Sequence, residues 1–404
     1  MDKRAANLAV LVAALGYFVD IYDLILFSVV RVRSLTDIGV PEAELLDAGV
    51  RLINLQMFGM LVGGILWGVL GDRRGRLSVL FGSIVLYSLA NLANAFVTSV
   101  ESYGALRFIA GIGLAGELGA GITLVAEVMS KESRGYGTAV VAGIGVLGAI
   151  AAALVAEAFD WRTAYIVGGV MGLALLALRV AVRESHMFQS VKSTPIGRGN
   201  FFALFADRRR GIRYLSVILV AVPIWYVIGI LVTFSPEFAK ALDLGYTPSA
   251  GRAILWLYAG LAVGDVASGA LSQVIQSRKR AIGLFLGLTV TGCAAYFLEV
   301  AGTLAGFYAL CSAMGFAIGY WAVFVTMAAE QFGTNLRATA TTSAPNFVRG
   351  AVVPMTWAFQ SFRDGGLGVV GGGIAVGVVV LVIAVIALLA LGETYGKDLD
   401  YVES

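Results

Sequence analysis

The chain has little charge, one histidine, two cysteines and seven prolines. Of its 404 residues, 14% are charged and 59% are hydrophobic, whereas soluble domains carry roughly 25% charged residues. The single His186 lies in a polar stretch, and HExxH and CxxC motifs are absent, so we expect no metal, cofactor or catalytic residues. Cys293 and Cys311 fall inside apolar runs, which makes a disulfide improbable. These absences argue against an enzyme.

Long apolar runs fill most of the sequence. About 20 apolar residues span a bilayer as a helix, and a backbone in lipid must satisfy its own hydrogen bonds. We therefore predict an all-α integral membrane protein with 12 transmembrane helices, placed at 8–30, 52–70, 78–97, 102–129, 138–157, 163–182, 214–238, 253–274, 281–300, 304–329, 338–362 and 368–391. Lys3 and Arg4 precede a run without a convincing cleavage site, which predicts a retained first helix and cytoplasmic termini.

A polar and basic segment divides the chain. It includes the run Arg208-Arg209-Arg210 and predicts a cytoplasmic linker over 183–213. We expect a six-helix bundle over 1–182, a second over 214–391 and a cytoplasmic tail over 392–404. The net charge of +3 is distributed over short loops, so it orients the chain in the bilayer and does not indicate nucleic-acid binding.

A charged loop separates the second and third predicted helices. It reads Gly68-Val69-Leu70-Gly71-Asp72-Arg73-Arg74-Gly75-Arg76, and its arginines favour the cytoplasmic side. Near the ends of the fourth and tenth helices, a glutamate precedes an arginine by seven residues, at Glu127 and Arg134 and at Glu330 and Arg337. Because these matches recur at an offset of about 200 residues, we predict two related halves.

The loop pattern Gly-x-x-x-Asp-Arg-x-Gly-Arg resembles the signature loop of the major facilitator superfamily of secondary transporters. Arg183-Glu184-Ser185 and Gly392-Glu393-Thr394-Tyr395-Gly396-Lys397 are similar to endings found in sugar porters and metabolite:proton symporters, although both lack the proline. The resemblance implies two six-helix halves that rock around a substrate at their interface. It also implies a cytoplasmic gate formed by Gly68, Asp72, Arg73, Gly75, Arg76, Glu127, Arg134, Glu330 and Arg337.

Several charged residues lie at bilayer depth, where charge is costly and indicates function. Burial disfavours a charged carboxylate, so acids at this depth can load and release protons. We predict proton coupling by Asp20, Asp23, Glu117 and Asp265, together with Arg107. Arg107 lies at a depth close to that of Asp23, and a pair between them would either transfer protons or fix helix 1 against helix 4. Asp265 could equally be a polar contact between helices 5 and 8.

Arg349 near the middle of the eleventh helix bears on the substrate class. A buried guanidinium needs a carboxylate or an anionic substrate, and its fork suits bidentate binding. One alternative is therefore substrate contact or gating, and the other is a permanent pair with Glu117 or Asp20. Further candidate substrate contacts are Asn346, Tyr320, Trp321 and Tyr17.

These features predict a secondary transporter that works by alternating access and couples the uptake of a small organic anion to protons. We expect a monomer in the plasma membrane, which is the inner membrane if the source is bacterial. A sugar or polyol porter is the alternative, followed by a drug:proton antiporter and a non-transporting receptor. The antiporter is disfavoured because Gly143–Ala149 lacks the proline typical of such exporters. Sodium in place of protons also stays open.

Overall fold

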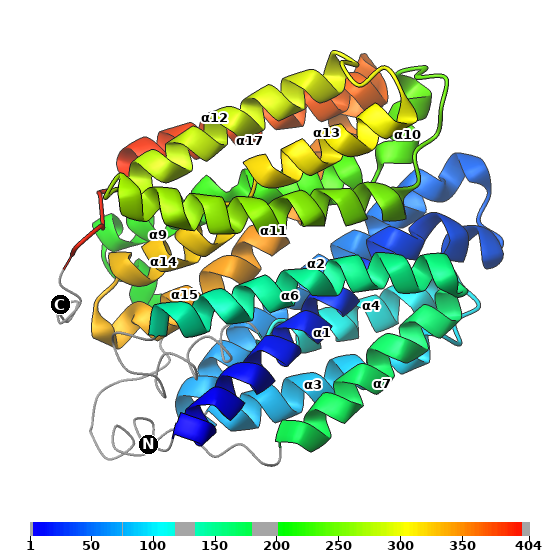
Figure 1. The fold of residues 1–404 in the computed structure, drawn as a ribbon. Helices are drawn as coiled ribbons and strands as arrows, with labels where there is room; N and C mark the ends of the chain where they lie inside the picture. The colour runs from blue at the N-terminus through cyan, green and yellow to red at the C-terminus, as the bar shows by residue number, and fades with distance from the viewer. Residues whose placement is uncertain (1–2, 75, 118–133, 180–200, 398–404) are drawn as a thin grey trace.

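The computed structural model describes residues 3–74, 76–117, 134–179 and 201–397. Within those ranges, the side chains of 3–9, 71–78, 134–140, 179, 334–335 and 338 are outside the description. The described residues form helices and turns without a strand (Figure 1), which confirms the all-α prediction. Nine helical stretches within the described ranges are long and apolar enough to cross a membrane, and one of them, Thr339–Ala390, covers two predicted spans.

The N-terminal helices overlap the first six predicted spans. The elements are α1 (Lys3–Asp37), η1 (Glu42–Glu44), α2 (Leu45–Arg74), α3 (Arg76–Asn94), α4 (Val100–Leu114), α6 (Arg134–Ala158) and α7 (Trp161–Arg179). The charged loop predicted at 68–76 is mostly helical, because α2 continues to Arg74 and α3 begins at Arg76. Arginine and leucine are good helix formers, and no proline interrupts them.

The C-terminal helices overlap the other six spans. The elements are η2 (Phe201–Phe205), α9 (Arg208–Tyr226), η3 (Val227–Val232), α10 (Ser235–Ala241), α11 (Ala250–Val274), α12 (Arg278–Phe297), α13 (Leu304–Ala317), α14 (Trp321–Gln331), α15 (Thr334–Gly350), α16 (Val352–Phe362), η4 (Arg363–Leu367) and α17 (Gly368–Ala390). Residues 208–213 of the predicted linker therefore belong to a helix.

Among the described residues, four predicted helices are interrupted. The fourth breaks after Leu114, the seventh contains the π-helix η3 four residues after Pro223, the eleventh breaks at Ala351, and the tenth breaks between α13 and α14. At the last break, a Cβ on Gly319 would lie 2.6 Å from backbone atoms of Gly264, so the chain contacts α11 backbone to backbone. Asp265 then accepts a hydrogen bond of 3.1 Å from the backbone N–H of Ala322 and caps the start of α14.

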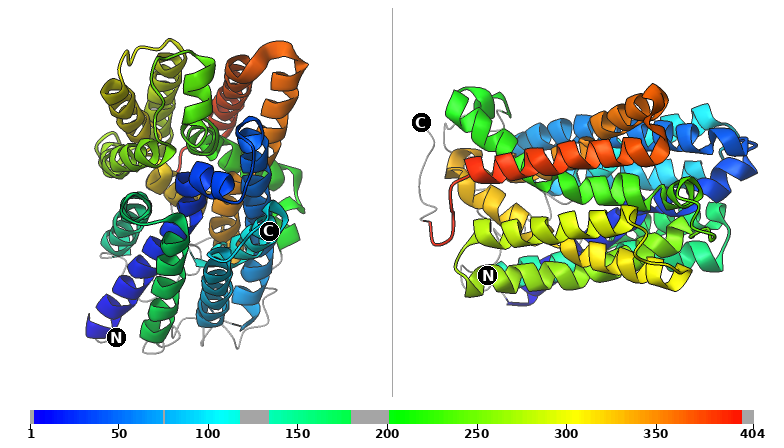
Figure 2. Two further views of the ribbon diagram at one scale, coloured as in Figure 1. Left: turned by 90° about the vertical axis from the view of Figure 1, so that its right-hand side faces the viewer. Right: turned by 90° about the horizontal axis from the view of Figure 1, so that it is seen from above.

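The ribbon forms two bundles. In Figure 1, α1, α3, α4, α6 and α7 lie in the lower part of the view and α9, α11, α12, α13 and α17 lie in the upper part, and Figure 2 shows the same grouping. We call the end at which α1 begins and α17 finishes the inner end, and the opposite end the outer end. The outer end contains the last turns of α1, the start of α2, and α10.

Close helix contacts repeat in the two bundles. Gly59 and Gly63 of α2 lie against the backbone of α4, and Gly260 and Gly264 of α11 lie against that of α13. A Cβ at any of these four positions would come within 2.4 Å of a carbonyl oxygen, so a larger residue would push the helices apart. Both pairs are separated by the same 201 residues, which agrees with the predicted offset between halves.

Candidate functional site

Two predicted site residues from opposite bundles meet near the middle of the molecule. Nη2 of Arg349 lies 3.8 Å from Oδ2 of Asp20, and the two side chains are 1% and 0% exposed. This distance is longer than the 2.7–2.9 Å of a close charged hydrogen bond, so the contact is ionic but loose. Nε and Nη1 of Arg349 donate no hydrogen bond to any described residue. Arg349 thus contacts one acidic side chain, Asp20, and its Nε and Nη1 atoms are available to donate to a ligand.

Aromatic side chains surround this guanidinium. It lies 5.8 Å from the centroid of the Trp321 ring, and the indole N–H of Trp321 has no acceptor among the described residues. Tyr17 is buried and interacts with Arg349 both by a side-chain hydrogen bond and electrostatically, and Tyr258 is buried within electrostatic range of Arg349. Tyr258 was not predicted from the sequence, although it stands seven residues before Asp265 and therefore on the same face of α11. The described arrangement offers cationic and N–H donors beside flat apolar surfaces.

A second buried cluster lies within the N-terminal bundle. Arg107 of α4 is 0% exposed, donates from Nη2 to Oδ1 of Asn91 on α3, and lies 5.0 Å from the Tyr165 ring centroid. Asp23 of α1 is also 0% exposed and interacts electrostatically with Arg107. The structure thus places the two members of the predicted pair within electrostatic range of each other, and Asn91 interacts with both. Asn91 and Tyr165 were not predicted from the sequence, because neither residue type is unusual in a membrane helix.

Other predicted residues lie outside these two clusters or on their edges. Glu117 accepts a hydrogen bond of 3.0 Å from Ser83 of α3. Tyr320 donates to the carbonyl oxygen of Val220 at 3.1 Å, so its hydroxyl points into the C-terminal bundle. Asn346 donates to the carbonyl oxygen of Ala115 at 3.0 Å, and this bond joins α15 to the residue that follows α4. Asp265 caps α14. From the sequence, the alternative to proton coupling for Asp265 was a polar contact between helices 5 and 8.

The predicted gate residues are partly described. Glu330 pairs with Arg278 at 3.4 Å and accepts a hydrogen bond of 2.7 Å from Thr394, whereas Arg337 donates from Nε to the carbonyl oxygen of Ala329 at 3.0 Å. These contacts connect α12, α14 and the segment after α17 at the inner end. Gly68 lies in α2. The side chains of Asp72, Arg73, Arg76 and Arg134, and the whole of Gly75 and Glu127, lie outside the described residues.

Glu393 fixes the segment after α17 to the start of α12. Its carboxylate accepts hydrogen bonds from the Ser277 hydroxyl and from the backbone N–H groups of Arg278, Thr394 and Tyr395. Burial tends to raise the pKa of Glu393, but these hydrogen bonds outweigh it and lower the pKa from 4.5 to about 2. The deprotonated, charged form of Glu393 is therefore the form that holds the segment after α17 against the start of α12.

This docking should depend on pH. Since the pKa is lower in the folded chain, the contribution of Glu393 is complete above pH 4.5 and is lost as the pH falls toward about 2. We expect hydrogen-exchange protection of the Thr394 and Tyr395 amides, corrected for intrinsic rates, to fall over that interval. Glu393→Gln should show low protection at every pH. Equal protection in the variant and the unmodified chain would contradict this account.

Ion pairs that were not predicted from the sequence close the outer end across the two bundles. Arg31 of α1 is 0% exposed and contacts both carboxylate oxygens of Glu237 on α10, at 2.6 and 2.8 Å. It also donates to the carbonyl oxygens of Leu45 and Thr233, each at 3.3 Å. We call the Arg31–Glu237 pair the outer latch. Three more pairs join the bundles at this end among the described residues: Lys240–Glu42, Arg252–Glu157 and Arg363–Asp47.

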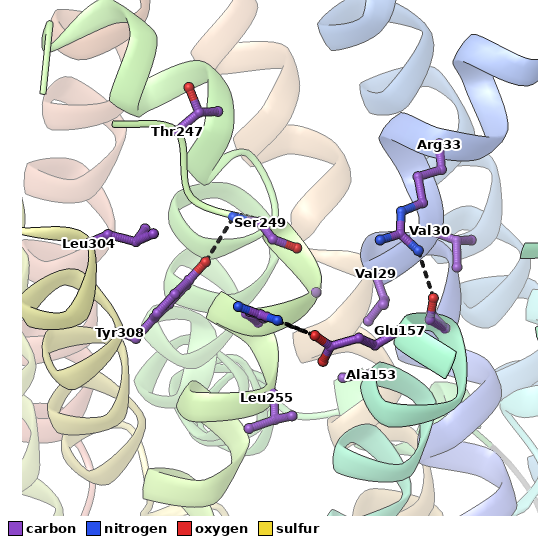
Figure 3. Close-up of a pocket in the computed structure, with 13 residues that line it drawn as sticks. Val29, Val30, Arg33, Ala153, Glu157, Thr247, Ser249, Leu255, Leu304 and Tyr308 are labelled. Atoms are coloured by element: carbon purple, nitrogen blue, oxygen red, sulfur yellow. Dashed lines mark hydrogen bonds and ion pairs between the residues drawn. The ribbon is translucent and has the colours of Figure 1, made fainter. Parts of the chain in front are cut away.

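A pocket of about 300 Å³ lies between the bundles at the outer end (Figure 3). Arg33 and Glu157 line it from the N-terminal side, and Arg252 and Tyr308 line it from the C-terminal side. The Arg252–Glu157 ion pair crosses from one wall to the other, as the dashed line in Figure 3 shows. The described parts of the two bundles therefore touch at the outer end through charged side chains as well as through apolar residues of the pocket wall such as Val29 and Leu255.

Two helical bundles that meet at opposed buried charges define a polytopic membrane transport protein. The family model of the Major Facilitator Superfamily matches residues 8–354, and the chain belongs to this family. It is therefore a multi-pass transporter of the plasma membrane and not an enzyme.

Relatives and solved structures agree with this assignment. A niacin transporter of Acinetobacter baylyi is 25% identical, and the alignment covers 96% of this chain and 94% of that protein. A gentisate transporter of Corynebacterium glutamicum is 28% identical over 70% of this chain and 66% of that protein. The crystal structure of a D-xylose-proton symporter superposes with a TM-score of 0.72 at 19% identity and covers 96% of this chain and 99% of that one. The last comparison bears on the fold alone.

Proposed function

We propose that this chain is a proton-coupled symporter of a small organic anion. The observation that carries the proposal is Arg349, a buried guanidinium between the bundles that has one loose acidic contact and two nitrogens without an acceptor among the described residues. A guanidinium with free donors recognises a carboxylate in bidentate geometry. Trp321 and the tyrosines Tyr17 and Tyr258 provide flat surfaces against which an aromatic or aliphatic body packs.

Relatives support the same substrate class. The niacin and gentisate transporters are named for small aromatic acids, and both align with most of this chain. A sugar or polyol porter is the second candidate, because Glu393 and Thr394 resemble the sugar-porter ending. With a neutral sugar bound, Asp20 alone would compensate the positive charge of Arg349. We therefore favour an anionic substrate.

The Asp23–Arg107 cluster is the proposed proton site. Asp23 is fully buried, and its partners are the Asn91 side chain and, at electrostatic range, Arg107, with no ion pair to a described cation. A buried charge with imperfect partners is costly, and protonation removes that cost. Asp23 would thus be charged when Arg107 is closest and neutral when the cluster rearranges. Asp20 would sense substrate through Arg349, which it touches.

Alternating access follows from the cross-bundle contacts. The outer latch and its neighbouring ion pairs close one end, and we propose that this end faces the cell exterior. The inner end carries many of the described basic residues, including Arg209, Arg278 and Lys279, which favours the cytoplasmic side by the positive-inside rule. Opening the outer end then requires these ion pairs to break while the contacts between α2 and α15 rearrange.

Reconstitution tests the proposal. The chain is inserted into liposomes with a trapped pH-sensitive dye, and monocarboxylates, dicarboxylates, aromatic acids and sugars are added in turn. We expect internal acidification with an aromatic or aliphatic acid and none with sugars. Asp23→Asn should abolish proton movement while exchange of labelled solute across the membrane continues. Acidification by sugars alone would favour the sugar or polyol porter instead. Binding without any flux would refute transport.

A further inference from the structure

A basic pocket lies at the inner end, away from both buried clusters. It has a volume of about 360 Å³ and is formed by the first turns of α9 and the end of α17. Its lining comprises Asp207, Arg209, Arg210, Ile212, Arg213, Ala390 and Gly392. Three arginines against one aspartate give this lining an excess of positive charge. No step of the proposed transport cycle uses it.

The aspartate does not neutralise the pocket fully. Asp207 caps α9 by accepting a hydrogen bond of 3.0 Å from the backbone N–H of Arg210. Arg210 donates to the carbonyl oxygen of Ala203 at 2.8 Å and is nearly buried, whereas Arg213 lies 4.9 Å from the Phe332 ring centroid. Arg209 is exposed; its backbone N–H bonds to Asp207, which also attracts its charge, and no described residue accepts a hydrogen bond from its guanidinium. Its guanidinium can therefore reach a ligand at the mouth of the pocket.

The surface next to the pocket is apolar and exposed. On α9, Ile212 and Leu215 are 49% and 47% exposed, and on α17, Ile386 and Leu389 are 60% and 70% exposed. In a membrane-spanning bundle, such residues contact acyl chains. The arginines thus lie where the two helices leave the hydrocarbon, at the depth of lipid headgroups.

We propose that this pocket binds the headgroup of an anionic phospholipid, with Arg209 and Arg213 contacting its phosphate. Arginine binds phosphate oxygens in bidentate geometry, and basic pockets between membrane helices suit anionic headgroups. A lipid fits better than a soluble phosphate because the adjoining apolar surface of α9 and α17 accommodates its acyl chains. Occupancy would hold the start of α9 against the end of α17.

Binding is measured on the purified full-length chain in neutral detergent micelles, by native mass spectrometry during titration with phosphatidylglycerol. Phosphatidylcholine and inorganic phosphate are titrated in parallel. The test variant is Arg209→Gln, whose exposed side chain leaves the fold intact, and the matched control is Arg280→Gln, an exposed arginine on the first turn of α12. We expect Arg209→Gln to weaken phosphatidylglycerol binding about tenfold, as loss of one charged hydrogen bond implies, and Arg280→Gln to leave it unchanged.

Three results would overturn the proposal. Equal weakening by the control variant would show diffuse charge attraction. Equal binding of phosphatidylcholine would show that the phosphatidylglycerol signal reflects acyl chains alone. Inorganic phosphate that displaces phosphatidylglycerol completely would identify a soluble-anion site. Because the assay measures binding and not flux, its outcome is independent of whether the chain transports an organic anion.

Discussion

Arg349→Gln should reduce kcat/KM for organic-acid uptake by about 100-fold or more. The substitution removes the bidentate cation that we assign to the substrate carboxylate, and such charged contacts contribute about 1.5–3 kcal/mol each. It also leaves Asp20 buried without its cation, a condition that costs about 3–5 kcal/mol unless the acid takes up a proton. Initial rates of labelled-acid uptake into liposomes, over a range of substrate concentrations, measure the effect.

Two companion variants separate binding from folding. Arg349→Gln combined with Asp20→Asn removes both charges, so the double variant should recover the thermal stability that the single variant loses and should still fail to transport. Arg349→Lys keeps the charge but loses the fork, and we expect intermediate uptake. If the double variant transports the acid normally, Arg349 is a structural ion-pair partner and the proposed substrate contact is wrong.

The buried charges were largely predictable from the sequence. Asp20, Asp23, Arg107 and Arg349 interrupt apolar runs, and the cost of charge in lipid identifies such residues without a fold. Helix depth also predicted that Asp23 and Arg107 lie close, because rise per residue fixes position along the membrane normal. Depth leaves open which acid meets Arg349, since several helices cross the same level. The structure selects Asp20.

The outer latch could not be predicted in the same way. The sequence places Arg31 just after the first predicted helix, where a charge is ordinary, and its partner Glu237 lies 206 residues away at the end of another predicted helix. Arg31 is buried only in the folded arrangement, in which α1 continues to Asp37 and Glu237 of α10 lies against the Arg31 side chain. The break in the tenth helix is similar, because Gly319 reads as a packing residue until α11 is seen against it.

Glu237→Gln should release the outer end. The substitution leaves Arg31, which is 0% exposed, with an uncompensated buried charge, and removing one partner of a buried pair costs about 3–5 kcal/mol. An outer-open state in which water reaches Arg31 avoids that cost, so its population should rise at least tenfold. Thr356 reports the opening, because it is 0% exposed and bonds to Asn54 across the bundles at 2.6 Å. The measurement is the rate at which a maleimide labels Thr356→Cys with and without Glu237→Gln.

The chain supplies a matched control for this experiment. Glu42 pairs with Lys240 at the same end, but the two side chains are 80% and 77% exposed, and exposed pairs contribute about 0–1 kcal/mol. Glu42→Gln should therefore leave the labelling rate of Thr356→Cys within about twofold. Labelling of the native Cys293 and Cys311 should be slow in all variants, because both are buried in the C-terminal bundle. Equal acceleration by Glu42→Gln and Glu237→Gln would mean that the outer end is held by summed surface charge, and that burial gives Arg31 no special role.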